Sequence, residues 1–500
     1  MLNHLPILQV IVPLLAAPAC LLLNKPRLSW LFACFAAVIS LLISGALLYQ
    51  VQQSGVISYM LGGWDAPWGI EYRIDLLSAY VLLIVSAIGT VVLLAANTSI
   101  RQEIDEDKQS VFYVLYLLCM AGLLGIVATG DIFNVFVFLE ISSLATYALV
   151  AFGRDRRALL AAYQYLILGT IGATFLLLGI GLLYSLTGTL NMQDLAERLP
   201  VASESATVYT AFAFMIVGVC LKLALFPLHL WLPNTYTYAP SIVTAFLAAT
   251  ATKVAIYLLI RLYFSVFGAD FSALPIQPIF IGLGLVSVFV ASTVAIKQPN
   301  IKRLFAYSSV AQIGYMIIGI GIGSSLGLQA TLLHLFNHAL MKGALFLALA
   351  AVVYRIGSAE RSGFNGLAKQ MPWTMAAIVV AGLSLIGVPL TVGFVSKWYL
   401  VLASFQSGLW PVALLIVIGS LLSIYYVWAL VESAYFGKAA MPSNVSSSSA
   451  ANLSPIKEAP LSLLIPIWIL VLANVYFGID TRLPLEASAT AANFLMGGGS

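Results

Sequence analysis

Long apolar segments recur along almost the whole of this chain. A helix needs about 20 mostly apolar residues to cross the hydrocarbon core of a bilayer. Only 8% of the residues are charged, whereas a soluble domain is about 25% charged. The sequence therefore predicts an all-α polytopic membrane protein with about fourteen transmembrane helices, placed at residues 5–23, 28–50, 76–96, 111–129, 132–152, 161–187, 208–232, 239–265, 278–296, 304–323, 328–354, 372–403, 409–436 and 460–478.

Lysine and arginine are distributed unevenly between the loops that join these spans. If the N-terminus lies outside, fifteen of the 23 fall on the cytoplasmic side, five fall within spans, and three fall on the outer side, namely Arg73, Arg198 and Arg482. Cytoplasmic loops of membrane proteins carry the excess of positive charge. We therefore expect both termini on the outer side, in agreement with an even number of spans.

The parts of the chain outside the spans carry little chemistry. The four cysteines are scattered in apolar segments without a C-x-x-C pair, so we interpret them as small buried side chains. Residues 437–459 are rich in serine and predict a flexible cytoplasmic linker. Residues 54–75 predict a loop or hairpin on the outer surface. Topology explains the net charge of +4, and nothing indicates binding to nucleic acid.

Ionisable residues inside the predicted spans mark the candidate functional site. The segment from Gly218 to Arg261 contains Lys222 and Lys253, and Pro227 interrupts it. A charge near the bilayer centre costs about 2.5–3.5 kcal/mol on insertion scales. Proline removes a backbone donor, so we expect a broken or kinked helix around Lys222. Broken helices beside buried ions are typical of transporters.

Two further spans contain ionisable residues far from their ends. Glu140 is the only acid well inside a span. His334, His338 and Lys342 are spaced by four residues in the segment HLFNHALMKGALF. This spacing places the three side chains on one face of a helix.

A second interruption precedes the last buried lysine. Gly387 and Pro389 lie in the middle of the span 372–403, and Lys397 follows them. Interrupted helices in two halves of a transporter indicate inverted repeats. Because the two interrupted spans are the seventh and the twelfth, spans 4–8 and 9–13 are the predicted repeats. The expected divisions are 1–110 for the first three spans, 111–265 and 278–436 for the repeats, and 437–500 for the linker, last span and tail.

These side chains together suit the transfer of protons. Burial disfavours the charged form of an ionisable group and an opposite charge restores it, so a Glu–Lys pair changes protonation when its geometry changes. Histidine titrates near neutral pH, and water links groups that do not touch. The expected proton path consists of Glu140, Lys222, Lys253, His334, His338, Lys342 and Lys397.

Simpler explanations remain open for several residues. Glu140 and Lys222 can form a purely structural ion pair, and the two histidines can be core residues. An H-x-x-x-H pair can bind a metal, but no third ligand lies nearby in the sequence. His229, close to Pro227, either lines a cavity or caps free carbonyl groups. Arg261 lies near the outer interface, where we expect it to snorkel toward water.

Five sequence motifs resemble those of a known family. They are VFLE, LKLALFPLHLWLP, YAPSIVTAFLAATATKVAIYLLIR, HLFNHALMKGALF and GVPLTVGFVSKW, and they surround the residues of the expected path. The set is similar to the antiporter-type membrane subunits of respiratory complex I, membrane hydrogenases and Mrp-type multisubunit Na⁺/H⁺ antiporters. The resemblance covers about residues 60–440. It implies fourteen spans, two inverted five-span repeats and proton translocation. The residues it implies are a Glu140–Lys222 pair, a connecting Lys253, central His334, His338 and Lys342, and a terminal Lys397.

Within this family, the segment from Leu61 to Val85 and the chain length resemble the D-type components of Mrp antiporters. The resemblance implies a proton-translocating subunit of a secondary Na⁺/H⁺ antiporter rather than an enzyme. It also implies a bacterial inner membrane and partner subunits of types A, B, C, E, F and G. The alternative is a proton-pumping subunit of a complex I-like NADH:quinone oxidoreductase or a membrane hydrogenase. We expect no cofactor or metal here, and we expect Na⁺ to cross mostly elsewhere in the complex.

Overall fold

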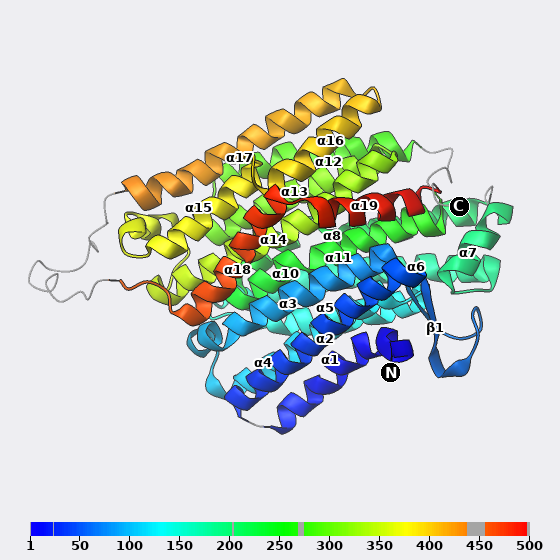
Figure 1. Ribbon diagram of the computed structural model, residues 1–500, viewed down its shortest axis with the longest axis horizontal. Helices are drawn as coiled ribbons and strands as arrows, with labels where there is room; N and C mark the ends of the chain where they lie inside the picture. Colours follow the sequence, from blue (N-terminus) through cyan, green and yellow to red (C-terminus); the bar gives the residue numbers. More distant parts are fainter. Residues whose placement is uncertain (1, 24, 203–204, 269–274, 438–455, 498–500) are drawn as a thin grey trace, which may run out of the picture.

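The apolar segments form helices that run roughly side by side along the molecule (Figure 1). The computed structural model describes residues 2–497 except 24, 203–204, 269–274 and 438–455. Within these residues, 13 helical segments are long and apolar enough to cross a membrane. Twelve of them are unbroken helices: α1 (Leu5–Leu22), α2 (Pro26–Ser54), α3 (Leu76–Glu103), α4 (Glu106–Ala128), α5 (Ile132–Ala151), α6 (Arg157–Thr187), α8 (Ala206–Leu223), α12 (Ile276–Ile296), α13 (Ile301–Gly321), α14 (Ser325–Ile356), α17 (Trp410–Phe436) and α18 (Leu461–Ile479).

Two predicted interruptions are present. Helix α8 ends at Leu223, and α9 (Trp231–Tyr238) begins after a turn that contains Pro227. The predicted span 372–403 is divided between α15 (Pro372–Ile386) and α16 (Val392–Gln406). Each of these has 15 residues, which is roughly 22 Å of helix and less than the hydrocarbon thickness of about 30 Å. The two helices can cross a membrane only together.

A third interruption corrects the expected span 239–265, which the sequence predicted as continuous. The span is divided at Thr250 into α10 (Ser241–Ala249) and α11 (Ala251–Ile260), and it continues as the π-helical segment η4 (Arg261–Val266). Thr250 has φ −126° and ψ −58°, which is not helical, and its Oγ1 donates a hydrogen bond to the Phe246 carbonyl at 2.7 Å. No proline or glycine marks the position, so composition did not reveal the break.

Several short elements lie outside the spans. Strands β1 (Ile57–Met60) and β2 (Glu71–Ile74) form an antiparallel hairpin, so the hairpin expected within residues 54–75 is present. Helix α19 (Arg482–Leu495) was not predicted, because it is too short and too polar for a span; it packs against α14 and α3. Residues 438–455 of the expected linker lie outside the described residues. The other short helices are α7 (Met192–Arg198), η1 (Leu2–His4), η2 (Leu61–Gly63), η3 (Leu199–Ala202), η5 (Arg361–Phe364) and η6 (Leu367–Lys369).

Helix α14 lies at the centre of the second half of the bundle. It contacts α3, α10, α13, α15, α16, α18 and α19. Apart from Phe336, every residue from Gly327 to Val352 is buried. A helix that is covered on all sides holds its polar residues in the interior rather than at a surface. The histidines and the lysine predicted on this helix therefore lie inside the protein.

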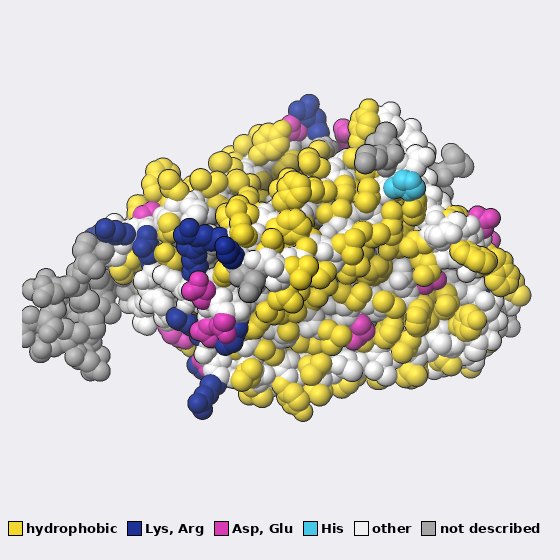
Figure 2. All heavy atoms as spheres, turned by 90° about the horizontal axis from the view of Figure 1, so that it is seen from below, with side chains coloured by type: hydrophobic (Ala, Val, Ile, Leu, Met, Phe, Trp, Pro, Cys, Tyr) yellow, Lys and Arg dark blue, Asp and Glu magenta, His cyan; other side chains and the backbone are white. Residues whose placement is uncertain are grey.

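Charge and hydrophobicity are segregated on the surface. Apolar side chains cover much of the face in Figure 2, and most of the visible Lys and Arg side chains gather at one end, which we call the basic end. Both chain termini lie at the opposite end, which we call the terminus end (Figure 1). The four cysteines are free and buried. The surface thus has the distribution expected of a protein that crosses a bilayer.

Candidate functional site

Glu140 of α5 and Lys222 of α8 form an ion pair. Nζ of Lys222 lies 3.8 Å from Oε1 of Glu140, and it donates hydrogen bonds to Ser143 Oγ at 2.8 Å and to Tyr147 OH at 3.3 Å. The lysine side chain is 8% exposed and that of the glutamate is 27% exposed. Oε1 of Glu140 has no hydrogen-bond partner among the described atoms. The lysine is therefore held mainly by hydroxyl groups of α5, with the carboxylate at a longer distance.

The break after α8 sets the position of Lys222. The lysine is the penultimate residue of the helix, and Ala224 follows with a left-handed φ of 59°. Such a conformation costs a non-glycine residue about 1–2 kcal/mol, so contacts elsewhere must hold it. One of them is the hydrogen bond from the indole Nε1 of Trp231 to the Leu221 carbonyl at 2.9 Å. The turn thus holds the end of α8 beside α5.

A small cavity adjoins Lys222. It has a volume of about 40 Å³ and lies between α4, α5, α6, α8 and α11. Ser142, Ser143 and Thr146 of α5 contribute hydroxyl groups to its wall, and side chains of α11 close the far side. One water needs about 10–15 Å³ of such volume. The cavity therefore has room for a few water molecules between Lys222 and the helix that carries Lys253.

Lys253 lies at the start of α11, directly after the break at Thr250. Its side chain is completely buried, and Nζ donates hydrogen bonds to the Ala248 carbonyl and to Thr252 Oγ1 at 3.3 Å. The carbonyl belongs to the last turn of α10. Free carbonyl groups at the C-terminal end of a helix attract cations. The break therefore supplies a polar partner that an unbroken apolar helix would lack.

His334, His338 and Lys342 follow one face of α14, as their spacing predicted. The two imidazole rings are 6.0 Å apart with an angle of 7° between their planes. His334 Nδ1 lies 2.9 Å from Ser396 Oγ, and Lys342 donates to Ser308 Oγ at 2.5 Å. His334 Nε2 and both ring nitrogens of His338 are buried without a hydrogen-bond partner among the described atoms. Buried polar atoms of this kind are usually satisfied by water.

Lys397 of α16 caps the C-terminal end of α15. Its ammonium donates hydrogen bonds to the carbonyls of Leu385 and Ile386, both at 2.9 Å, and to Ser420 Oγ at 2.8 Å. The ring of Tyr315 lies 5.1 Å from the same nitrogen. The two carbonyls are the last of α15, where the helix dipole is negative. The interruption thus provides Lys397 with its acceptors.

Charge interactions connect the two halves of the site. Lys253 lies within electrostatic range of Lys342 and His338, and Lys397 lies within electrostatic range of His334. Direct hydrogen bonds between these five side chains are absent from the described part of the chain. Transfer of a proton between them therefore requires water or side-chain movement. We call the seven predicted residues, from Glu140 to Lys397, the buried row.

The sequence left open that His334 and His338 bind a metal, but the described structure lacks the ligand set that such a site needs. None of its residues form a group of three or more His, Cys, Asp and Glu side chains that could hold a metal. His334 and His338 are parallel and stacked. The partner of His334 Nδ1 is a serine hydroxyl rather than a carboxylate.

A second buried ion pair corrects the prediction for Arg261. The sequence predicted that this side chain snorkels to water, but its guanidinium binds the carboxylate of Asp75, and the two residues are 8% and 3% exposed. Asp75 is the N-cap of α3, and Ser78 and Tyr257 complete the cluster. The pairing was missed because the partners are 186 residues apart in sequence.

Hydroxyl groups are the other contacts that the sequence did not reveal. Ser143 and Tyr147 bind Lys222, Ser396 contacts His334, and Ser420 binds Lys397. Serine and tyrosine are frequent in apolar helices, so no local signal distinguished these four. His229 lies in the turn before α9, with its ring 5.2 Å from that of Phe226 and 6.2 Å from that of Tyr307, and its Nδ1 has no partner among the described atoms.

Known proteins resemble this chain over almost its full length. Residues 129–423 match the family model described as NADH:quinone oxidoreductase/Mrp antiporter, TM. The chain is 43% identical over 492 residues to the N-type component of the NADH-quinone oxidoreductase of Desulforudis audaxviator, covering 96% of each. It is 31% identical over 438 residues to the D-type component of the Na⁺/H⁺ antiporter of Alkalihalophilus pseudofirmus, covering 87% of this chain and 88% of that protein. Its fold matches a chain of the Mrp complex from Dietzia sp. DQ12-45-1b with a TM-score of 0.90 and 26% identity, covering 99% and 97% of the two chains.

Proposed function

Because the chain belongs to the NADH:quinone oxidoreductase/Mrp antiporter family of membrane subunits, we propose that it is the D-type, proton-translocating subunit of a multisubunit Na⁺/H⁺ antiporter. The observation that carries the proposal is the buried row, in which Lys222, Lys253 and Lys397 lie beside helix breaks. Ionisable side chains are expensive inside a membrane, and they mark ion pathways and proton relays. The chain is then part of a secondary active transporter and not itself an enzyme.

The proposed proton path begins at the Glu140–Lys222 pair. The carboxylate attracts a proton to this region, and the loose 3.8 Å pair lets Lys222 change partners between Glu140 and the hydroxyl groups of α5. Water in the adjoining cavity of about 40 Å³ connects Lys222 to α11. Lys253, at the break in this span, is the next acceptor.

The second half of the row receives the proton on α14. Because Lys253 and Lys342 repel each other, a proton that arrives at one favours departure from the other. The unsatisfied ring nitrogens of His338 and His334 offer successive acceptors toward Lys397. In this scheme two half-paths open to opposite sides of the membrane and meet at the histidines.

The two predicted interruptions support the plan of two inverted repeats, 111–265 and 278–436, flanked by residues 1–110 and 437–500. The break after α8 follows Lys222, and the break after α15 precedes Lys397. Ala224 and Leu390 are the non-glycine residues with positive φ in the described chain, one at each break. Repeated local geometry of this kind is what a repeat interface with an ion site would produce.

The surface around Glu140 supports partner subunits. Phe133, Val137 and Leu144 are 43%, 37% and 57% exposed on the same side of α5, where the Glu140 side chain is 27% exposed. A carboxylate is costly in contact with lipid, so a neighbouring protein covers this face. In the proposed antiporter the partners are of types A, B, C, E, F and G, and Na⁺ crosses mostly through them. The basic end faces the cytoplasm, and both termini face the outer side of a bacterial inner membrane.

A redox-driven role is the second candidate. It is favoured by the 43% identity to a protein named as the N-type component of an NADH-quinone oxidoreductase. The buried row would then move protons in response to electron transfer in partner subunits. The membrane part of the mechanism is the same, and the driving reaction differs.

Na⁺-dependent proton exchange tests the proposed function. Everted vesicles containing the full complex are energised to form a pH gradient, and Na⁺ is added. We expect Lys222→Ala and Glu140→Ala to reduce exchange to background with the complex intact on a native gel, because each removes half of the first pair. Lys369→Ala, at a position outside the row, should exchange like the wild type.

The outcomes separate the candidates. Exchange that persists in both variants would make the Glu140–Lys222 pair structural and reject the relay. A wild-type complex without any Na⁺-dependent signal would reject the antiporter in favour of the redox-driven subunit. In that case, proton uptake during electron transfer to quinone should depend on Lys222 in the same way.

A further inference from the structure

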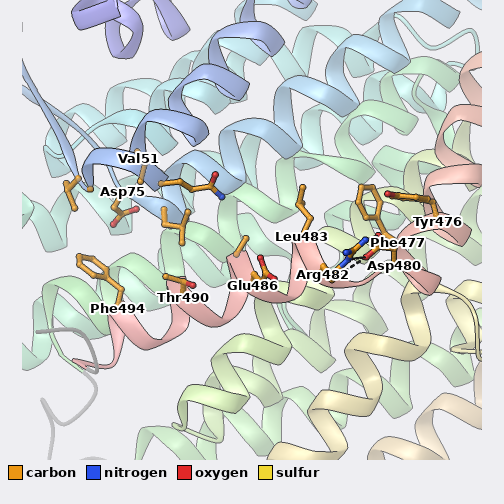
Figure 3. Close-up of a pocket in the computed structure, with 15 residues that line it drawn as sticks. Val51, Asp75, Tyr476, Phe477, Asp480, Arg482, Leu483, Glu486, Thr490 and Phe494 are labelled. Atoms are coloured by element: carbon orange, nitrogen blue, oxygen red, sulfur yellow. Dashed lines mark hydrogen bonds and ion pairs between the residues drawn. The ribbon is translucent and has the colours of Figure 1, made fainter.

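A large cavity opens at the terminus end, and none of the residues of the buried row is among those that line it. Its volume is about 900 Å³, and segments of α2, α3, α18 and α19 surround it. Figure 3 shows Asp75 on one wall, with Glu486 and Thr490 of α19 on the other. The cavity is lined mainly by apolar side chains, and Asp75, Asp480, Arg482 and Glu486 give it charged positions.

The Asp75–Arg261 pair adjoins this cavity, because Asp75 is one of its lining residues. The Asp75 carboxylate accepts from the guanidinium of Arg261 and from the Ser78 amide at 2.9 Å. Arg261 also donates to Ser78 Oγ at 2.9 Å and to Tyr257 OH at 3.0 Å. Tyr257 OH donates in turn to the Val127 carbonyl of α4 at 2.9 Å. Polar contacts thus continue from the cavity wall into the bundle.

The same helix face leads on to the buried row. Lys253, Tyr257 and Arg261 are spaced by four residues, so they follow one face of α11. Eight residues of helix span roughly 12 Å. Tyr257 is the polar side chain between the lysine and the ion pair on this face. Arg261 also begins the π-helical segment η4, and π-helical turns are frequent at functional sites.

We propose that the Asp75–Arg261 ion pair is a proton gate between the cavity at the terminus end and Lys253. This inference rests on the proposed transfer of protons through the buried row. When the pair is closed, the two charges are in contact and the guanidinium, which does not release its proton, repels hydrated protons. When it opens, water reaches Tyr257. A proton then leaves the Lys253 ammonium through Tyr257 to water in the cavity, so that the lysine becomes a neutral amine and a water molecule becomes hydronium.

A passive leak tests this gate without any driving reaction. The purified complex is reconstituted in liposomes without Na⁺ or redox substrates, a pH gradient is imposed with the membrane potential clamped, and its decay is followed with a dye. Asp75→Asn keeps the shape of the side chain but removes the charge that holds Arg261. We expect this variant to leak protons several-fold faster than the wild type. Asp75→Asn combined with Lys253→Ala should leak at the wild-type rate, because the internal proton donor is gone.

Asp480→Asn is the matched control. Asp480 lines the same cavity, but its ion-pair partner is Arg482 instead of a residue of the broken span. Asp480→Asn should leave the rate of proton leak unchanged.

Arg261→Gln removes the other half of the gate and should leak like Asp75→Asn. The proposal would be overturned if neither gate variant leaked, or if the leak persisted in the variant without Lys253. It would also be overturned if both gate variants failed to assemble, because the ion pair would then have a structural role. A wild-type complex that shows no Na⁺ exchange would reject the antiporter and leave this test unaffected.

Discussion

The lysines of the buried row differ in whether a carboxylate lies near them. Lys222 has a carboxylate nearby, whereas Lys253, Lys342 and Lys397 donate to carbonyl and hydroxyl oxygens in the described structure. A carbonyl accepts from an ammonium and also from a neutral amine, since both carry N–H groups. These three lysines can therefore gain or lose a proton while their partners stay in place.

Lys397 allows the roles of hydrogen bonding and proton release to be separated. Lys397→Met leaves the carbonyls of Leu385 and Ile386 without a donor, so we expect a loss of about 1–3 kcal/mol in stability as well as loss of exchange. Lys397→Arg keeps donors at the end of α15 but does not release its proton. We expect it to abolish exchange with less loss of stability. Thermal unfolding of the purified complex and vesicle exchange measure the two effects; an Arg variant that exchanges would contradict proton release at this position.

At the scale of the elements, the interruptions supply hydrogen-bond acceptors inside an apolar bundle. An unbroken helix satisfies most of its own carbonyls, whereas a break leaves some of them free to accept from a side chain. The breaks at Thr250 and after Ile386 free carbonyl groups at the centre of the bundle, and Lys253 and Lys397 bind them. At Lys253 and at Lys397, the buried lysine and the helix break beside it therefore form one structural unit.

Leu390 tests whether the second break is strained. Its φ is 69° and its side chain is 68% exposed, so a change there affects mainly the backbone. Glycine adopts the left-handed conformation without the steric cost of about 1–2 kcal/mol, which raises the free energy of unfolding. The greater backbone freedom of glycine in the unfolded chain offsets about 0.5–1 kcal/mol of this gain. We expect Leu390→Gly to unfold at a slightly higher temperature than the wild type, and the β-branched Leu390→Val at a lower one. Equal midpoints for Gly and Val would show that the turn relaxes freely.

Helix α3 fixes the ends of the broken span. At its start, Asp75 binds Arg261 at the end of α11. At its end, Glu103 accepts hydrogen bonds from the Ser241 amide at 2.8 Å and hydroxyl at 3.2 Å, at the start of α10. Because α3 is unbroken over 28 residues, it holds both halves of the neighbouring span at a set separation. The position of Lys253 therefore depends on a helix outside the predicted first repeat.

At the scale of the whole molecule, the distribution of Lys and Arg predicts the orientation in the membrane. The native cysteines are buried, so single introduced cysteines can be labelled selectively. Val201 is 93% exposed at the terminus end, and Lys108 lies at the basic end with its side chain 50% exposed. We expect an impermeant maleimide to label Val201→Cys in intact cells and Lys108→Cys in everted vesicles only. The reverse pattern would place the termini in the cytoplasm.

Much of this architecture follows from the sequence by itself. The bilayer demands about 20 apolar residues per span, so the spans are visible as segments and any charge inside them stands out. Helical periodicity is local, so the common face of His334, His338 and Lys342 follows from their spacing. Pro227 and Gly387 likewise mark two of the breaks, because their backbone chemistry acts on adjacent residues.

Only the tertiary structure decided which of these residues meet. Lys222 contacts Ser143, 79 positions earlier, and Arg261 binds Asp75 across 186 positions, because distant helices pack together there. The break at Thr250 and the serine and tyrosine partners of the lysines carry no local signal, since the same residue types occur throughout apolar helices. Pairing and burial depend on packing between helices, which residue spacing within one helix does not specify.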